Sequence, residues 1–218
     1  MKRLIIIGEG ATEQEFCKGV LAPYFYSKGI RIENPKIRAS RGGIVPWPKL
    51  KDEIEIYLKN DTNAYVTLLI DYYGLYDKHY FPCWEEAHKE ATKAECVSVI
   101  ELGMKEEVNK KLSDRFIPYI QLHELEALIF SDPSVVLSNF EESEFKNIEY
   151  LDATLKEFPN PEDINNNKQT APSKRLERIF RNYRKVVFGS LLLEEIGLPK
   201  IRKKCPRFNA WIQELESI

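Results

Sequence analysis

The sequence predicts an α/β protein with a mostly parallel sheet, and three short apolar runs carry this prediction. They are Lys-Arg-Leu-Ile-Ile-Ile at 2–7, Ala-Tyr-Val-Thr-Leu-Leu-Ile at 64–70 and Arg-Phe-Ile-Pro-Tyr-Ile-Gln-Leu at 115–122. Continuous apolar runs that stop abruptly at a polar residue are typical of parallel strands buried on both faces. Segments with helical spacing separate the runs, and this alternation favours a parallel sheet flanked by helices.

The segments between the predicted strands carry helix signals. Thr12-x-x-Glu15 fits a capping box that begins a helix just after the turn Gly8-Glu9-Gly10. Further helices are expected over Pro48–Leu58 and over most of Trp84–Val108. We therefore expect an α/β core at 1–135, an acidic loop and helical insertion at 136–170, and a basic helical C-terminal region at 171–218 that packs on the core.

Composition excludes several classes of protein. With 43% hydrophobic and 30% charged residues, the 218-residue chain can build a core and is not disordered. No apolar run approaches the ~18 to 20 residues of a membrane helix, and the apolar stretch near Met1 is too short for a signal peptide, so we expect a cytoplasmic protein without membrane contact. The four cysteines form no Cys-x-x-Cys pair, which argues against a zinc ribbon or a redox motif.

Charge is segregated along the last third of the chain. Residues 139–163 have a balance of −6, whereas residues 168–207 have a balance of +9. A basic segment of this strength favours a polyanionic partner, and we prefer nucleic acid over the alternative of an ordinary solvated surface. Between the two segments, Asn165–Thr170 has the composition of a loop, and Arg41-Gly42-Gly43 fits a plain turn better than a phosphate cradle.

The basic segment predicts one helix over Pro172–Lys185, because Leu176, Ile179, Phe180 and Tyr183 recur at helical spacing. The opposite face would be basic. At the start of this helix the backbone amides also favour a bound anion, so basic residues there are well placed to contact a phosphate. We expect four side chains to contact phosphates: Lys174, Arg175, Arg178 and Arg181.

Acidic residues follow each of the three predicted strands. They are Glu9, Asp71 and the pair Glu124 and Glu126. Ligands of open α/β sheets bind outside the carboxyl ends of the strands, so we expect these acids to converge on one site. Carboxylates without His or Cys partners favour Mg²⁺ or Mn²⁺. The alternative for each acid is a helix cap, and Glu124 and Glu126 share a face only if the chain is extended there.

Several motifs resemble a known family. Ile5-Ile-Ile-Gly-Glu9-Gly-Ala-Thr-Glu13 and Tyr65-Val-Thr-Leu-Leu-Ile-Asp71-Tyr-Tyr-Gly74 look like the signatures of Toprim domains, which topoisomerases, primases and overcoming-lysogenization-defect nucleases share. The segments Phe116–Pro133 and Thr170–Leu176 resemble an uncharacterised bacterial family of Toprim-like proteins found near defence-type ATPases. This second resemblance spans nearly the whole chain and implies a Toprim-like, Rossmann-like fold.

The resemblance implies a Mg²⁺- or Mn²⁺-dependent phosphodiester site. Glu9 and Asp71 would be catalytic metal ligands and Lys174 would meet the phosphate, with Glu13 and His123 behind them. The second aspartate of the Toprim Asp-x-Asp pair is Tyr73 here, so Glu124 or Glu126 would have to complete the metal site.

Two functions from different classes follow from these observations. The first is a nuclease that acts on DNA or RNA, with an AAA-type ATPase partner in a phage-defence system. The second is a catalytically incomplete Toprim-like subunit that binds or regulates such an ATPase, which Tyr73 favours. A small-molecule phosphohydrolase is a weaker third alternative, because it would not need the basic segment. The sequence leaves open whether the protein forms a homo-oligomer.

Overall fold

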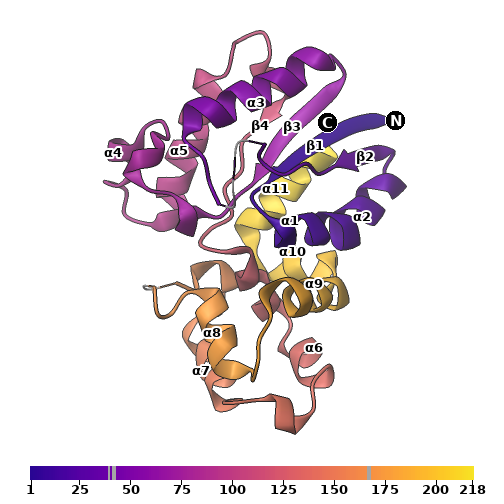
Figure 1. Ribbon diagram of the computed structural model, residues 1–218, viewed down its shortest axis with the longest axis vertical. Coiled ribbons are helices and arrows are strands. Elements are labelled where there is room, and N and C mark those ends of the chain that lie inside the picture. The colour runs from indigo at the N-terminus through magenta and orange to yellow at the C-terminus, as the bar shows by residue number, and fades with distance from the viewer. Residues whose placement is uncertain (39, 41–42, 166–167) are drawn as a thin grey trace. The chain divides into compact units, whose positions relative to one another are not determined.

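The computed structural model describes residues 1–38, 40, 43–165 and 168–218. It divides into two compact units (Figure 1). The first contains Met1–Leu122 and Trp211–Ile218, and the second contains His123–Ala210. The boundary after Leu122 and the return of the last helix to the first unit differ from the predicted bounds at 135 and 170. Arg41 and Gly42 of the predicted turn, and part of the predicted loop at 165–170, lie outside the described residues.

A parallel sheet forms the centre of the first unit. Its strands lie in the order β2-β1-β3-β4, and every pairing between these described strands is parallel, as the sequence predicted. The strands are β1 (Lys2–Gly8), β2 (Ile30–Glu33), β3 (Ala64–Leu69) and β4 (Phe116–Ile117). β4 is much shorter than the predicted strand, since Pro118 has no N–H to continue the ladder. The chain pairs again only at a bridge between Asp71 and Gln121.

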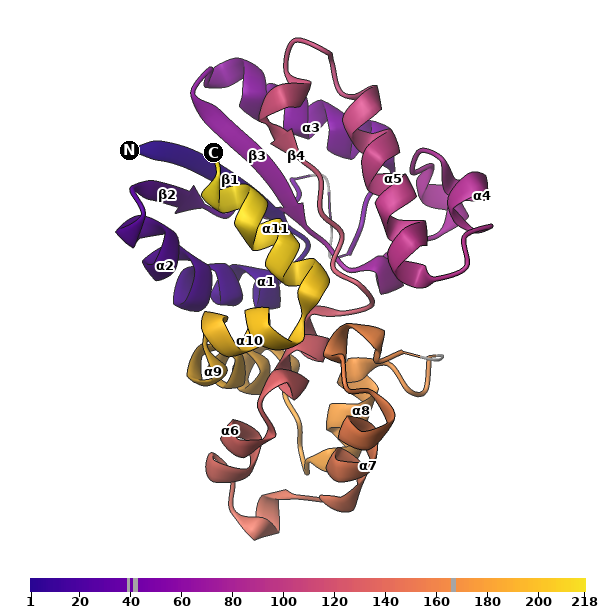
Figure 2. The ribbon, with the colours of Figure 1, turned by 180° about the vertical axis from the view of Figure 1, so that it is seen from behind.

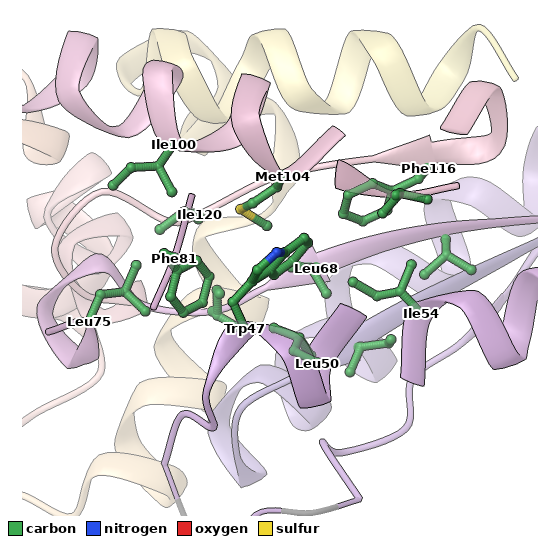
Figure 3. Close-up of a cluster of buried hydrophobic side chains, with 14 of the residues drawn as sticks. Trp47, Leu50, Ile54, Leu68, Leu75, Phe81, Ile100, Met104, Phe116 and Ile120 are labelled. Atoms are coloured by element: carbon green, nitrogen blue, oxygen red, sulfur yellow. The ribbon is translucent and has the colours of Figure 1, made fainter. Parts of the chain in front are cut away.

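One face of the sheet is covered by α3 (Trp47–Asn60) and α5 (Lys93–Glu107). Trp47 and Leu50 of α3 are fully buried in a cluster with Leu68 of β3 and Met104 of α5 (Figure 3). The Trp47 indole donates a hydrogen bond of 2.6 Å to Glu107. The helix predicted over 84–108 is divided into α4 (Trp84–Ala87) and α5, because a capping box at Thr92 starts a new helix.

The other face carries Leu4 and Ile6 and lies against the helices of Ala11–Ser27 and the end of α11 (Figure 2). These are α1 (Ala11–Phe16), the π-helical turn η1 (Cys17–Leu21), α2 (Ala22–Ser27) and α11 (Pro206–Glu216). In α11 the Trp211 indole donates a hydrogen bond of 2.9 Å to Thr67. The predicted cap at Thr12 is wrong: the helix begins at Ala11 with Gly10 at the cap position, and Thr12 is buried.

The second unit is built from short helices around a buried 3₁₀ helix, η5 (Leu125–Ser131), every residue of which is buried. The surrounding helices are α6 (Pro133–Ser138), α7 (Glu149–Glu157), α8 (Pro172–Ile179), α9 (Lys185–Ile196) and α10 (Leu198–Lys204). Short 3₁₀ turns complete the described elements: η2 (Tyr72–Gly74), η3 (Asp77–His79), η4 (Ser113–Arg115), η6 (Glu142–Glu144) and η7 (Pro161–Asp163).

The single helix predicted over Pro172–Lys185 is wrong beyond Ile179. Phe180 is extended and forms an antiparallel bridge with Phe145. Asn182 has a left-handed backbone with a φ of 56°, which a helix cannot accommodate. Among the described residues no helix has both the length and the apolar character needed to cross a membrane.

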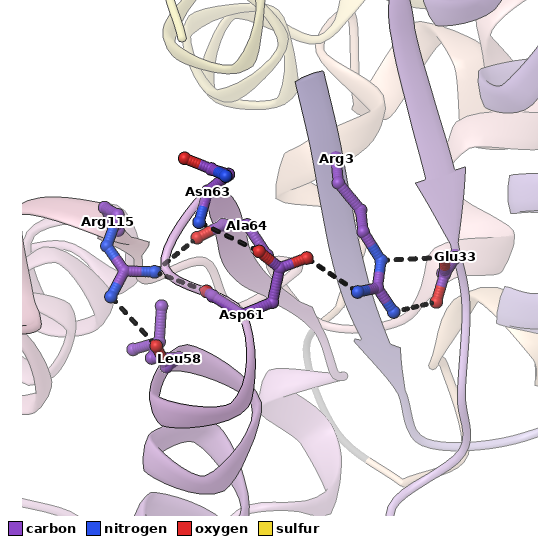
Figure 4. A network of polar contacts seen from close by, with 7 residues as sticks. All are labelled: Arg3, Glu33, Leu58, Asp61, Asn63, Ala64 and Arg115. Atoms are coloured by element: carbon purple, nitrogen blue, oxygen red, sulfur yellow. Dashed lines mark hydrogen bonds and ion pairs between the residues drawn. The ribbon is translucent and has the colours of Figure 1, made fainter. Parts of the chain in front are cut away.

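Charged side chains join the strands at the amino edge of the sheet (Figure 4). Arg3 of β1 binds both oxygens of Glu33 of β2, at 2.8 and 2.7 Å, and reaches Asp61 at 2.7 Å. Arg115 donates to three backbone carbonyls, those of Leu58, Asp61 and Ala64. The hydrogen bonds from Arg3 lower the pKa of Glu33 below its ordinary value.

Replacing Arg3 with Met should lower the free energy of unfolding at pH 7 by about 1 kcal/mol, because a partly exposed, bidentate pair is lost. A lowered carboxyl pKa contributes stability above its unfolded value of 4.5, and this contribution is lost as the pH falls through the folded pKa. Urea unfolding of wild type and variant should therefore differ at pH 7, and the difference should shrink as the pH is lowered below 4.5. Lys2→Met is the matched control, and a loss that is equal at both pH values would contradict the ion-pair explanation.

Candidate functional site

The structure brings Glu9 and Asp71 together at the carboxyl edge of the sheet. Glu9 follows β1 and Asp71 follows β3, and these strands are neighbours paired up to Gly8 and Leu69. The backbone N–H of Asp71 donates a long hydrogen bond of 3.4 Å to Oε2 of Glu9. Asp71 is buried, and its side chain does not cap the turn η2 that follows it. For this pair the predicted proximity is observed, and the capping alternative does not account for Asp71.

Glycine backbone lies close to the Glu9 carboxylate at two positions, Gly43 and Gly74. A Cβ atom at Gly74 would lie 3.6 Å from Oε1 of Glu9, so the turn after β3 passes close beside the carboxylate. Glu13 is also buried, and a Cβ at Gly10 would lie 3.1 Å from its Oε2, so a larger residue there would require the Glu13 side chain to shift. Glu13 thus lies against the turn that carries Glu9, and its predicted role behind the metal ligands stays a prediction.

Tyr73 lies in η2, where the Toprim pattern would place a second aspartate. The neighbouring chain is fixed by backbone pairing: Tyr72 N–H donates to the Gln121 carbonyl at 2.9 Å, and Gln121 N–H donates to the Ile70 carbonyl at 2.8 Å. These bonds hold the segment after β3 against the extended chain after β4.

Glu124 begins the second unit's acidic pair and acts as a helix cap. It is extended, and its carboxylate accepts hydrogen bonds from the Ser173 N–H at 2.8 Å and the Ser173 hydroxyl at 3.1 Å. Ser173 lies in the first turn of α8, so Glu124 caps a helix distant in sequence. The capping alternative therefore holds for Glu124. Each carboxylate has further lone pairs, so this role leaves acceptor capacity.

Glu126 is a fully buried carboxylate in η5. Its side chain is 0% exposed, and Nζ of Lys185 lies 2.9 Å from its Oε1. In the described part of the chain Oε2 has no hydrogen-bond partner. Burial raises the pKa of Glu126 to about 7, opposed by the charge of Lys185 and reinforced by that of Glu124. A buried, incompletely satisfied oxygen is expensive for the fold and is available to a further cation.

Tyr183 lies close to the same acids. Its hydroxyl is buried and has no hydrogen-bond partner among the residues described. Burial raises the pKa of Tyr183 first, and the negative charges of Glu126 and Glu124 raise it further. Glu124, Glu126, Lys185 and Tyr183 therefore form one electrostatic cluster inside the second unit, which we call the acidic cluster.

His123 adjoins the acidic cluster in a strained conformation. Its backbone φ of 64° lies in the left-handed region, which residues other than glycine rarely adopt. The imidazole is buried, and its Nδ1 lies 3.3 Å from Nδ2 of Asn165. Its predicted role behind the acids stays a prediction.

The four basic residues predicted to bind phosphate occupy different environments. Lys174 is exposed and pairs with Glu177 at 2.7 Å. Arg175 is 2% exposed and donates to the Thr170 carbonyl at 2.9 Å and to the Thr154 hydroxyl at 3.1 Å, a buried position that differs from the predicted one. Arg178 is exposed beside Tyr150, and Arg181 is exposed beyond the end of α8.

Lys185 is the functional candidate that sequence reasoning missed. We expected it to be one of many basic residues on the far end of a single helix, and no spacing signal set it apart. It is instead the first residue of α9, with a side chain that is 42% exposed and an ammonium group that binds a buried carboxylate. Lys174 has no such contact and pairs with a surface glutamate.

The donors of both pairs fit a hard divalent cation. In the ranges that the structure describes, no three His, Cys, Asp or Glu side chains are grouped so as to hold a metal ion. Mg²⁺ commonly binds through one or two carboxylates, with water and substrate phosphate as its other ligands. Glu9 with Asp71 supplies such a pair in the first unit, and the unpartnered Glu126 oxygen supplies an acceptor in the second. That all four acids hold one ion remains a prediction.

Fold and site together define an α/β protein with a Rossmann-like parallel sheet, acids at the sheet's carboxyl edge and a helical region rich in basic residues. Residues 8–216 match the family described as Domain of unknown function (DUF4276), and the chain belongs to this family. This confirms the expected membership of a family of unknown function. No curated protein and no solved structure matches the chain significantly.

Replacing Lys185 with Met should lower the free energy of unfolding by about 1–3 kcal/mol, because the buried Glu126 carboxylate loses its counter-charge. The double variant Lys185→Met with Glu126→Gln should regain most of this loss. Urea unfolding of the four proteins in a double-mutant cycle measures the coupling. Simple additivity of the two changes would contradict the ion pair.

The free energy of unfolding of the same variants should depend on pH in different ways. A carboxyl pKa raised to about 7 means that the folded protein holds a proton that the unfolded chain has released, so stability falls as the pH rises from 4.5 to about 7. Glu126→Gln should remove this component. Lys185→Met should extend the fall above pH 7, because Lys185 lowers the pKa. Unfolding curves from pH 5 to pH 8.5, compared with wild type, provide the check.

Proposed function

We propose that this protein is a Mg²⁺- or Mn²⁺-dependent nuclease that hydrolyses phosphodiester bonds by the chemistry of Toprim domains. The observation that carries the proposal is the pair Glu9 and Asp71 at the carboxyl edge of a parallel sheet, where open α/β folds bind their ligands. The Toprim-like motifs around both residues support it. A bound divalent cation would supply the positive charge that activates water and stabilises the transferring phosphate.

The chain's own residues have distinct parts in this proposal. Glu9 and Asp71 hold the cation, with Glu13 and the glycine backbone fixing the turn that presents Glu9. Within the second unit, Lys185 joins Lys174 as a candidate to meet a phosphate, because its ammonium is held by a buried acid and 42% of its side chain is exposed. Such a group can stabilise negative charge that develops on a phosphate. Lys174 and Arg178 contribute to phosphate attraction from the exposed surface.

A second function is favoured by a specific observation. Tyr73 replaces the expected aspartate, and Glu124 is engaged as the cap of α8. Both facts reduce the number of acids available to a metal and favour a regulatory subunit that binds an ATPase without cutting nucleic acid. The ATPase partner itself is a proposal in both cases, and it comes from the family resemblance alone.

Titration of Mn²⁺ into the metal-free protein by calorimetry tests the site. Glu9→Gln and Asp71→Asn should each weaken binding by at least about 100-fold, as expected when a direct ligand is removed. Glu15→Gln removes an exposed carboxylate from α1, the helix that follows Glu9, and should leave binding unchanged. Saturable binding that both site variants retain would exclude this pair as the metal site.

Cleavage assays separate the two functions. Wild type with Mn²⁺ should nick plasmid DNA or cut single-stranded RNA, and both site variants should abolish the activity. Binding of Mn²⁺ without cleavage of either substrate would favour the regulatory subunit. Glu126→Gln tests the predicted four-acid site: if one ion is shared, this variant and Glu9→Gln will not be additive in binding free energy, whereas two separate sites will give additive losses and two equivalents of metal.

A further inference from the structure

Two open cavities lie on either side of the loop between α8 and α9 in the second unit, and we refer to residues 180–184 as the α8–α9 loop. The first has a volume of about 470 Å³ and is bounded by the loop together with Lys146 and Glu177. The second, of about 580 Å³, is bounded by the loop, Ser143, Glu144 and Phe188. Both volumes suit a small ligand. Arg181, Asn182 and Tyr183 line both cavities and form the ridge between them.

Aromatic rings form the base of these cavities. Phe180 is buried and stacks with Phe145 at 5.3 Å, and Tyr183 lies nearly parallel to Phe180 at 6.1 Å. The rings of Phe188 and Tyr183 are 6.0 Å apart and are only partly buried. The inner ring of Phe180 is covered, whereas the outer rings of Tyr183 and Phe188 reach the cavity wall. Their flat faces can contact a planar ligand.

Positive charge surrounds the rings. Lys146 and Arg184 form no ion pair with any described carboxylate, and Arg184 lies over the Phe188 ring at 5.9 Å. The two acids in the cavity walls are already engaged: Lys174 binds Glu177 at 2.7 Å, and the N–H of Glu141 binds Glu144 at 2.9 Å. Three cations, Lys146, Arg181 and Arg184, line the cavities together with two acids, of which Glu177 is already paired with Lys174, so a net positive charge is left for a phosphate.

The α8–α9 loop is held in a defined shape. Arg181 N–H donates to the Glu144 carbonyl at 2.8 Å, and Nε of Arg181 donates to the Phe145 carbonyl at 3.1 Å. Lys146 N–H donates to the Ile179 carbonyl at 2.7 Å. These bonds fix the rings and cations relative to one another before any ligand arrives, which lowers the entropic cost of binding.

We propose that these cavities bind a nucleotide of a single nucleic acid strand, with its base against Tyr183 and Phe188 and its phosphates at Lys146, Arg181 and Arg184. Planar aromatic faces next to unpaired cations match the chemistry of an unstacked nucleotide, whereas the bases of a duplex are not free to reach the rings. Tyr183 connects this site to the acidic cluster, because the charges of Glu126 and Glu124 act on its hydroxyl. The choice of a single strand as the ligand rests on the proposed nuclease function. It specifies the class of substrate on which that nuclease would act.

The test measures binding of a fluorescein-labelled oligothymidylate by anisotropy in EDTA, so that catalysis and metal binding have no part in the result. The double variant Lys146→Ala with Arg184→Ala should weaken binding at least about tenfold and reduce the slope of log affinity against log salt by about 1.4, for two lost phosphate contacts. Lys156→Ala removes an equally exposed lysine from the same unit and should bind like wild type.

Ring stacking is tested separately. Phe188→Leu should weaken binding by about 5-fold to 150-fold, the range for the loss of one base–aromatic stack, whereas Tyr183→Phe keeps the ring and should retain affinity. An oligonucleotide with 4-thiothymidine should crosslink to Tyr183 or Phe188 under ultraviolet light. Unchanged affinity of the lysine and arginine double variant, or crosslinks only outside residues 143–188, would overturn the proposal.

Two further binding measurements distinguish a single strand from a duplex and from a free nucleotide. A duplex of the same length should bind more weakly than the single strand and be insensitive to Phe188→Leu. Adenosine monophosphate that bound as tightly as the oligonucleotide would overturn a strand as the ligand. Binding that passes these tests without any Mn²⁺-dependent cleavage would refute the nuclease and leave the nucleotide site intact, so the two failures are distinguishable.

Discussion

The parallel pairing of β1 with β3 is the constraint on which the first unit depends. This pairing is the longest in the sheet, and it aligns the ends of the two strands so that Glu9 and Asp71 emerge side by side. The same register brings Arg3 and Asp61 together at the opposite edge, where they form an ion pair. At the amino edge, this register brings together opposite charges that stabilise the fold. At the carboxyl edge it brings together two acids that cost the fold stability, and this is the edge available for ligands.

Burial of a carboxylate organises the second unit in a comparable way. Glu126 lies in a 3₁₀ helix seven residues long, whereas most such helices are shorter. Its charge is balanced by Lys185 from the start of α9, and Glu124 caps the start of α8. The two acids thereby connect η5 to the starts of both helices that flank the α8–α9 loop. The contacts that balance the buried charges therefore also position the helices on both sides of the loop that forms the proposed nucleotide site.

Prediction succeeded where a signal was local in the sequence. The apolar runs predicted three of the strands and the parallel sheet, and the acids after the first two runs predicted the Glu9 and Asp71 pair. Prediction failed where distant residues decided the outcome. Helical periodicity continued through Phe180 and Tyr183, but pairing of Phe180 with Phe145 and the left-handed backbone of Asn182 ended the helix at Ile179. Arg175 fitted a basic face in the sequence and is buried by contacts with Thr170 and Thr154.

The sequence by itself determined the class of fold, the acids that follow the first strands, the segregation of charge and the family, because each depends on the type and spacing of neighbouring residues. Only the tertiary structure decided which charged groups meet. Lys174 and Lys185 are chemically alike in sequence, yet the first pairs with a surface glutamate and the second with a buried one. A cation's function depends on the field around it, and that field comes from residues far apart along the chain.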